Sequence, residues 1–435
     1  MATAQTNPSA SVAAAAPGQA RAARLQALGI LCGFAAGAWL GAAEAPTKLV
    51  SIGVSPVVVS FMMVLGVFLA RWTIPSLFQG VSGIHADVKQ APHLIIWGVL
   101  AGCIWAVANT LTIFAIRDIG LSIAFPLWNS NSLLGIFWGF LLFNELRGAG
   151  ARRWFGVVGG AFVMFVGAVL LALVSSSQAS GGQAIRGVMG AVGAGVLWGT
   201  MYIPYRKAYL TGMSPLSFVA FFTIGELAMM SILGVTYSGG GQPFWAQLAS
   251  SKNVLFWLLL GGFIWVVGDI FQQYAAKYVG ICRGIPLSNT NQLWGLLWGV
   301  LVFGELRGGN HQSLAQVIGG SLLMALGAGA IALSSAEKHE QSRWREAAQR
   351  ETQRYGLDSS YVESRFMGEQ PAYKRTWLDF LLVGIAVAVI VFFARVAEVP
   401  QIQPHWGIMA ALVVAMLALA VPVVVGLWRT SQAKE

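Results

Sequence analysis

Long apolar stretches alternate with short polar segments along most of the 435-residue chain. A helix needs roughly 20 mostly apolar residues to cross the hydrocarbon core of a bilayer. Twelve stretches meet this length, at residues 26–46, 55–75, 93–114, 120–143, 153–175, 187–206, 215–236, 253–273, 280–304, 314–334, 377–397 and 406–428. The pattern therefore predicts an all-α integral membrane protein, because helices satisfy their backbone hydrogen bonds internally.

One stretch of the chain is duplicated, since residues 114–148 and 274–308 align at a shift of 160 positions. Matched pairs include Gly120 with Gly280, Pro126 with Pro286, Asn129 with Asn289, Asn131 with Asn291, Gly135 with Gly295, Trp138 with Trp298, Glu145 with Glu305 and Arg147 with Arg307. Weaker matches anchor all but the fifth span of each copy, and each copy comprises five spans. Because five is odd, the second copy enters the membrane upside down, which predicts a five-plus-five inverted repeat.

The repeat divides the chain into five segments. These are a disordered cytoplasmic N-terminus (1–24), repeat 1 (25–176), repeat 2 (187–335), a polar cytoplasmic linker (336–376) and an additional pair of transmembrane helices (377–428). The linker contains a charged stretch typical of a solvated or interfacial helix that ends at Gly356. It is either a tether to the last two spans or a surface for a partner or the membrane.

Composition and charge agree with a membrane protein. Hydrophobic residues make up 56% of the chain, charged residues only 10%, and the mean hydropathy is +0.67. In a soluble protein the net charge of +10 would suggest nucleic acid, but most of the 27 Lys and Arg residues fall on one side of the predicted spans. The positive-inside rule then predicts a multi-pass protein of the inner or plasma membrane with both termini cytoplasmic. In this count Arg71 belongs to a cytoplasmic helix end.

Several chemistries have no support in the residue pattern. Cys32, Cys103 and Cys282 stand singly, and the five histidines lie in loops or at span ends, so neither a metal site nor a disulfide framework is indicated. No nucleophile motif and no phosphate-binding GxxxxGK[ST] loop occurs. We therefore expect neither an enzyme nor a cofactor, and any energy source is a gradient or the solute itself.

The fourth and ninth predicted spans carry polar groups well inside apolar sequence. Lipid offers such groups no hydrogen-bond partner, and Pro126 and Pro286 each disturb the preceding helical turn. Either these groups line a substrate path, or they only join helices to one another. The candidate substrate-binding residues are Trp128, Asn129, Asn131, Ser288, Asn289, Asn291, Gln292 and, from the third span, Asn109.

The kind of polar group constrains the ligand. Amides and hydroxyls offer donors and acceptors without net charge, which suits a neutral polyhydroxylated solute, and nearby tryptophans can stack on a sugar ring or anchor the interface. An anionic ligand would need a buried cation. Arg283 is the one candidate for such a cation in the sequence, and we expect it to have a structural or lipid-facing role instead.

Three carboxylates fall within spans, namely Glu44, Glu226 and Asp269. A charge near the bilayer centre costs at least about 2.5 kcal/mol, so these groups should face the interior. They are candidate ion-coupling residues, with a proton or sodium ion as co-substrate, or else they form structural pairs. Glu145 and Arg147, at a span end, are expected to bond an adjacent loop, with gating as the alternative role.

These motifs carry a resemblance. The two polar, proline-containing helices ending in FNELRG and FGELRG resemble the drug/metabolite transporter superfamily, and within it the glucose/ribose porter and rhamnose transporter-like branch. The resemblance covers residues 25–335 and implies alternating-access uptake of a sugar-like solute, often with a proton. The linker and the last two helices depart from it, and a homodimer is compatible with them.

The sequence therefore predicts a secondary transporter of a neutral sugar or similar metabolite, acting in a lipid bilayer without nucleic acid. An exporter of amphipathic metabolites or drugs is one alternative, in which the tryptophans dominate recognition. A scaffold or sensor that uses residues 336–376 for partner contact and moves nothing is another.

Overall fold

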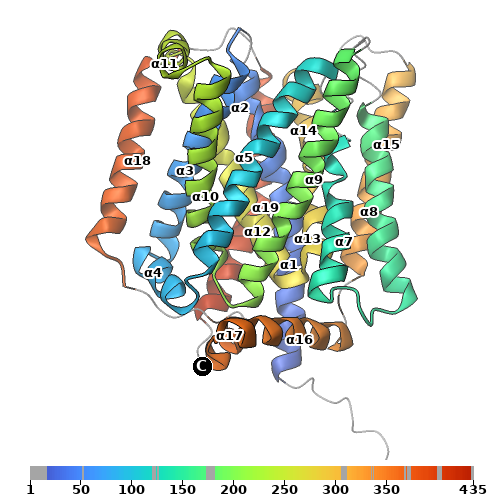
Figure 1. Ribbon diagram of the computed structural model, residues 1–435. Coiled ribbons are helices and arrows are strands. Elements are labelled where there is room, and N and C mark those ends of the chain that lie inside the picture. Colours follow the sequence, from blue (N-terminus) through green and yellow to red (C-terminus); the bar gives the residue numbers. More distant parts are fainter. Residues whose placement is uncertain are drawn as a thin grey trace, which may run out of the picture.

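The computed structural model describes residues 17–50, 53–119, 124, 127–172, 182–304, 311–334, 336, 338–366, 369, 374–398 and 404–432. Within these ranges ten helices are long and apolar enough to cross a membrane (Figure 1). They are α1 (Pro17–Ala42), α3 (Pro56–Phe78), α5 (Leu94–Ile119), α8 (Ala151–Ala172), α9 (Gly182–Leu210), α10 (Pro215–Tyr237), α12 (Leu255–Val279), α15 (His311–Leu333), α18 (Trp377–Val396) and α19 (Trp406–Gln432). The expected all-α membrane fold is confirmed.

The remaining two predicted spans are not single long helices in the described residues. Stretch 120–143 contributes the shorter apolar helix Leu127–Phe143, which includes α7 (Asn131–Phe143). Stretch 280–304 is divided into α13 (Ile281–Ser288), α14 (Asn291–Leu297) and the π-helix η2 (Trp298–Val302). The break has a local cause, because the hydroxyls of Ser288 and Thr290 bond the carbonyls of Ile285 and Leu287 at 2.7 and 2.8 Å. The polar residues therefore lie at an interruption of the helix.

The two halves pack reciprocally. Helix α1 packs against α12 and α9 against α5, while α3 contacts α12 and α10 contacts α5. Glycines 160 positions apart sit at the two crossings: a Cβ atom on Gly102 would lie 1.9 Å from the Phe222 carbonyl oxygen, and one on Gly262 would lie 1.9 Å from that of Met63. Only glycine permits such close backbone approach between membrane helices.

The short helices α4 (Val81–Gln90) and α11 (Gly241–Ser250) follow α3 and α10 at corresponding positions of the two copies. They lie at opposite ends of the bundle (Figure 1). A further short helix, α2 (Glu44–Lys48), lies near the end that carries α11. Equivalent elements at opposite ends are what two oppositely oriented halves require.

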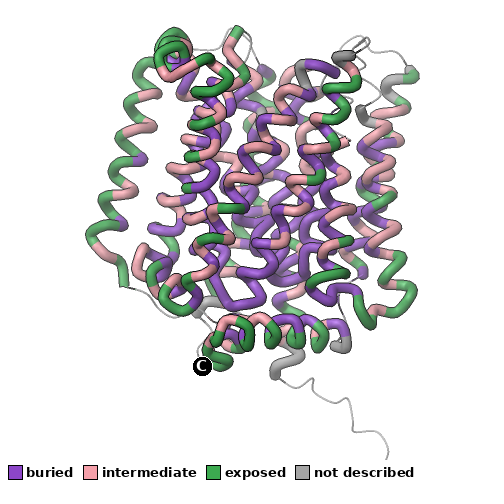
Figure 2. Tube along the Cα trace, in the orientation of Figure 1, coloured by how far each residue is buried: buried purple, intermediate pink, exposed green. Residues whose placement is uncertain are grey.

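The linker forms two helices, α16 (Lys338–Tyr355) and α17 (Ser359–Phe366), which lie across the end of the bundle that carries α4 (Figure 1). We call this the linker end. Helix α16 stops at Tyr355, before Gly356 with φ of 63°, where the sequence predicted a stop. The last two long helices lie at the periphery, α18 against α3 and α19 against α1, and both are largely exposed, as Figure 2 shows for α18.

Candidate functional site

Most of the predicted polar site residues gather where the fourth and ninth spans are interrupted. A cavity of about 10 Å³ lies there, between the interrupted helices and the helices α8 and α15. It is lined by Asn129, Ser132, Met164, Phe165, Pro286, Asn289, Gln292 and Met324. This volume suits one water molecule.

The lining of this cavity comes from both copies of the repeat. Asn129 and Asn289 are separated by 160 positions, as are Ser132 and Gln292, and so are Met164 and Met324. Three equivalent pairs therefore surround one cavity, with amide and hydroxyl groups on one side and thioethers on the other.

Hydrogen bonds join some of the predicted residues and separate another from them. The Asn289 amide donates a long bond of 3.4 Å to Oδ1 of Asn131, which connects the two halves directly. Ser288 accepts a bond of 2.6 Å from Gln272. Asn109 instead donates to Ser60 at 3.1 Å and joins α5 to α3, so it does not join the residues that line the cavity.

Several buried polar atoms find no hydrogen-bond partner within the described residues. One is the acceptor Oδ1 of Asn291. Others include the indole donors of Trp39 and Trp198 and those of Trp138 and Trp298, the last two of which are separated by 160 positions. Trp128, a predicted ligand contact, packs edge-on against Trp198 with ring centroids 6.1 Å apart. Buried donors and acceptors that lack partners are costly unless a ligand or water satisfies them.

A buried ionic cluster occupies the contact between α3, α10 and α12. Arg71 pairs with Glu226 through Nη1 and Oε2 at 2.7 Å, and with Asp269 through Nη2 and Oδ2 at 2.7 Å. All three side chains are at most 1% exposed. Arg71 also lies 4.3 Å from the ring centroid of Phe222. We call these three charged residues the triad.

The triad corrects one expectation and extends another. Arg71 does not lie at an exposed helix end, because it is buried inside α3. It brings together two of the three predicted ion-coupling carboxylates, Glu226 and Asp269. The cue in the sequence was its position inside the apolar stretch 55–75, about two helical turns before α3 ends. Asp269 has a second donor, Gln273 at 2.9 Å, whereas Oε1 of Glu226 has none in the described structure. One arginine and two carboxylates leave a formal excess of one negative charge.

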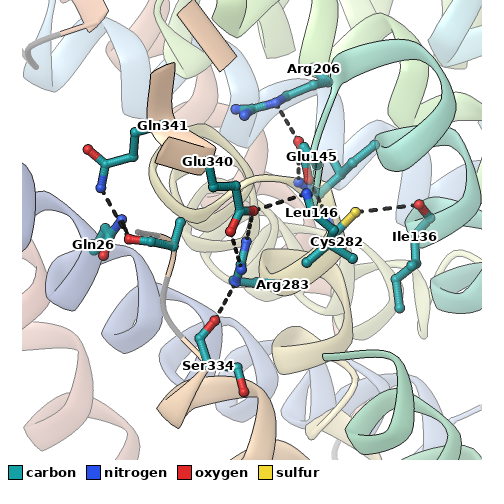
Figure 3. Close-up of polar contacts among 12 residues, drawn as sticks. Gln26, Ile136, Glu145, Leu146, Arg206, Cys282, Arg283, Ser334, Glu340 and Gln341 are labelled. Atoms are coloured by element: carbon teal, nitrogen blue, oxygen red, sulfur yellow. Dashed lines mark hydrogen bonds and ion pairs between the residues drawn. The ribbon is translucent and has the colours of Figure 1, made fainter. Parts of the chain in front are cut away.

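A second buried cluster lies at the linker end (Figure 3). Glu145 pairs with Arg206 at 2.6 Å and accepts bonds from the backbone N–H groups of Ile281 and Cys282 at 3.1 and 2.8 Å. Arg283 makes two bonds with Glu340 of α16, at 2.6 and 2.8 Å. We call the four charged residues of these pairs the linker-end cluster. Arg283 therefore has the structural role expected of it, but buried in protein rather than facing lipid.

Two remaining calls are not described. The side chain of Glu44, a predicted ion-coupling residue, lies outside the described residues, and so do Glu305 and Arg307 of the second copy. Among the described residues no cluster of histidine, cysteine and carboxylate side chains could hold a metal ion.

Comparisons with known proteins point in the direction of the sequence motifs. Residues 191–357 match the model of the family described as "Sugar transport protein". The chain is 25% identical over 230 residues to a candidate sugar uptake protein of Listeria innocua, and the matched segment covers 52% of this chain and 75% of that protein. It is 22% identical over 213 residues to the "Glucose uptake protein GlcU" of Staphylococcus xylosus, covering 49% of this chain and 69% of that protein.

A shorter match reaches higher identity. Over 87 residues, 19% of this chain and 30% of the relative, the identity to a candidate sugar uptake protein of Streptococcus pyogenes serotype M1 is 37%. These similarities confirm the resemblance to the sugar-uptake branch, and the chain is a multi-pass membrane protein.

Proposed function

We propose that this protein is a secondary transporter that moves a neutral sugar or similar polar metabolite across the cell membrane by alternating access. The observation that carries the proposal is the cavity whose polar walls come in equivalent pairs from the two copies of the repeat. Inverted-repeat transporters place their substrate between the repeats, at interrupted helices. The candidate sugar uptake proteins and the glucose uptake protein among the relatives support the sugar class.

The chemistry of the site favours an uncharged ligand. The polar groups around the cavity are amides and a hydroxyl, which donate and accept hydrogen bonds without carrying a net charge. The unsatisfied oxygen of Asn291, two residues after Asn289, offers a further acceptor for a hydroxyl. Arg71 and Arg283 are buried cations that could otherwise bind an anionic ligand, but each already pairs with a carboxylate.

The size of the cavity implies motion. Ligand pockets commonly have volumes of about 300–1,000 Å³, far above that of this cavity. In this structure the halves are closed around the site, so a sugar enters only after α7 and α13 separate from α8 and α15 or from their partners across the repeat. Rocking of one half against the other provides this movement.

The triad is the proposed coupling site. Its excess negative charge in a water-poor interior favours binding of one cation, because an uncompensated buried charge is costly. A single carboxylate oxygen without a donor, Oε1 of Glu226, suits a proton, whereas metal cations take several oxygen ligands. Solute uptake would then be coupled to proton entry.

The alternatives have less support. The scaffold interpretation requires an available linker, but Glu340, Trp344 and Arg365 of the linker are at most 3% exposed and bond their own bundle. The exporter interpretation depends on tryptophans rather than amides. No observation favours it over sugar uptake.

Uptake into proteoliposomes tests the proposal. A panel of radiolabelled monosaccharides is offered with and without an inward proton gradient, to wild type, Asn289→Ala and the control Asn253→Ala. Asn253 bonds Glu398 at the molecular surface and does not line the cavity. We expect gradient-stimulated uptake of one sugar, lost in Asn289→Ala and retained in Asn253→Ala. Folded, inserted protein that takes up no sugar under either condition would reject it.

A further inference from the structure

The linker touches both halves of the bundle through buried groups. At its start, the Glu340 carboxylate holds Arg283 of the second half and accepts a bond of 3.1 Å from the backbone N–H of Leu146 in the first half. One turn later, the Trp344 ring lies 4.9 Å from the guanidinium of Arg206, which pairs with Glu145 of the first half. One helix face therefore bridges the two copies of the repeat.

Two further bridges follow along the linker. Glu351 pairs with Lys207 of the second half, while Tyr355 stacks on His93 of the first half with centroids 3.7 Å apart and an interplanar angle of 9°. In α17, Arg365 pairs with Asp87 of α4, and Tyr361 donates to the same carboxylate at 2.9 Å.

The Asp87 carboxylate also reaches the second half. Its Oδ2 accepts bonds from the Ser214 backbone N–H at 3.1 Å and from the Ser217 hydroxyl at 2.7 Å. The linker thus spans the seam between the halves at three successive places.

The first bridge also controls a helix of the candidate site. Arg283 lies on α13, five residues before Ser288, which corresponds to about 7.5 Å along the helix axis. Two buried carboxylates hold the beginning of α13, Glu145 through its backbone N–H groups and Glu340 through Arg283 (Figure 3). Any separation of α13 from the first half at this end must break the Glu145 contacts, and it must part Glu340 either from Arg283 or from the Leu146 N–H.

We propose that helices α16 and α17 form a strap that keeps the linker end of the transport path closed, and that Glu340 is the positioning residue that locks α13. The inference rests on the proposed transport function for the meaning of the path. Opening of the linker end requires α16 to leave either Arg283 of the second half or its contacts with Leu146 and His93 of the first half. The strap thus sets how often that end opens.

A native thiol reports the opening. Cys282 is fully buried at the start of α13, with its Sγ donating to the Ile136 carbonyl at 3.4 Å. In protein carrying Cys32→Ala and Cys103→Ala, a polar maleimide reaches Cys282 only when the linker end opens. Loss of a buried charged partner shifts such an equilibrium strongly, so we expect labelling in Glu340→Gln to be at least about tenfold faster than in wild type.

Two variants complete the comparison. Trp344→Ala leaves all charges in place and removes the packing on Arg206, so it should accelerate labelling in the same direction by a smaller factor. Glu346→Gln is the matched control, because Glu346 is half exposed on the same helix and pairs only with exposed Arg343 in the described structure. Its labelling rate should equal that of wild type.

A second thiol separates opening from general loosening. Cys32 is fully buried in α1, within a different packing cluster, and is measured alone in Cys103→Ala, Cys282→Ala protein. Acceleration at Cys282 but not at Cys32 supports the strap. Equal acceleration at both thiols, or a Cys282 rate unchanged by Glu340→Gln, overturns it. Because no sugar is present, absence of sugar transport would reject the proposed substrate and leave this result standing.

Discussion

The triad and the linker-end cluster are both buried networks of arginine and carboxylate, but they differ in their charge balance. The linker-end cluster has two arginines and two glutamates, and each glutamate also accepts backbone N–H bonds. The triad has one arginine and two carboxylates, and one carboxylate oxygen has no donor in the described structure. The charges of the first network are balanced, whereas the second network has a formal excess of one negative charge.

This difference distinguishes the proposed lock at the linker end from the proposed ion-coupling site. A balanced buried network is disrupted when one partner is removed, because the other charge is left without compensation. An unbalanced network tolerates neutralisation of its excess group, since a one-to-one pair remains. The same substitution, glutamate to glutamine, should therefore destabilise the protein much more in the linker-end cluster than in the triad.

The largest effect is expected from removal of the only cation of the triad. Arg71→Gln leaves Glu226 and Asp269 facing each other in a dry interior, so we expect a loss of about 3–5 kcal/mol in the free energy of unfolding. Chemical unfolding in detergent measures it, with the exposed Arg429→Gln as control. A change below about 1 kcal/mol would contradict the ionic role assigned to Arg71.

Glu340→Gln should have the next largest effect. It leaves the Arg283 guanidinium buried without a counter-charge, and we expect the free energy of unfolding to fall by about 3 kcal/mol in the same assay. In the double variant Arg283→Gln, Glu340→Gln the loss should be smaller than the sum of the two single losses. Strict additivity would show that the two residues act independently.

Glu226→Gln should change stability by less than about 1 kcal/mol, because the Arg71–Asp269 pair that remains is balanced. Its effect should appear in transport: uptake of the sugar identified for wild type should no longer respond to a proton gradient. Exposed Glu363→Gln serves as the control and should keep the response. Destabilisation as large as that of Glu340→Gln would remove the distinction between the clusters.

The smallest effect concerns pH and the edge of the linker. Burial, followed by the nearby Lys207 cation, lowers the pKa of His93, while Glu351 opposes the shift. The folded state therefore favours neutral His93, and its contribution is present above about pH 6.5 and lost as the pH falls, because the unfolded chain binds the proton first. His93→Phe keeps the ring on Tyr355 and removes the titrating group, so the fall in melting temperature between pH 7.5 and 5.5 should be smaller than in wild type by about 1–2 °C. An unchanged fall would show that His93 does not titrate on unfolding.

The residues that line the cavity show how much of the candidate site the repeat could predict. The alignment at a shift of 160 identified Asn129, Asn289 and Gln292 as site residues, and the structure places all three on one cavity. Asn109 was selected by the same reasoning but bonds Ser60 instead. The direction in which a side chain points depends on helix rotation and packing, which a linear shift does not contain.

Amino-acid sequence alone predicted the spans, the duplication and the polar groups inside two of the spans, because hydrophobic length, residue repetition and residue chemistry can be read locally along the chain. It did not place the helix break, since Pro286 lies inside α13 and the interruption follows Ser288. Only the tertiary structure decided which charges meet. Arg71 is 155 residues from Glu226 and 198 from Asp269, and Arg283 is 57 residues from Glu340. In a low-dielectric interior each buried charge must find a partner wherever packing brings one, and that choice depends on the whole fold.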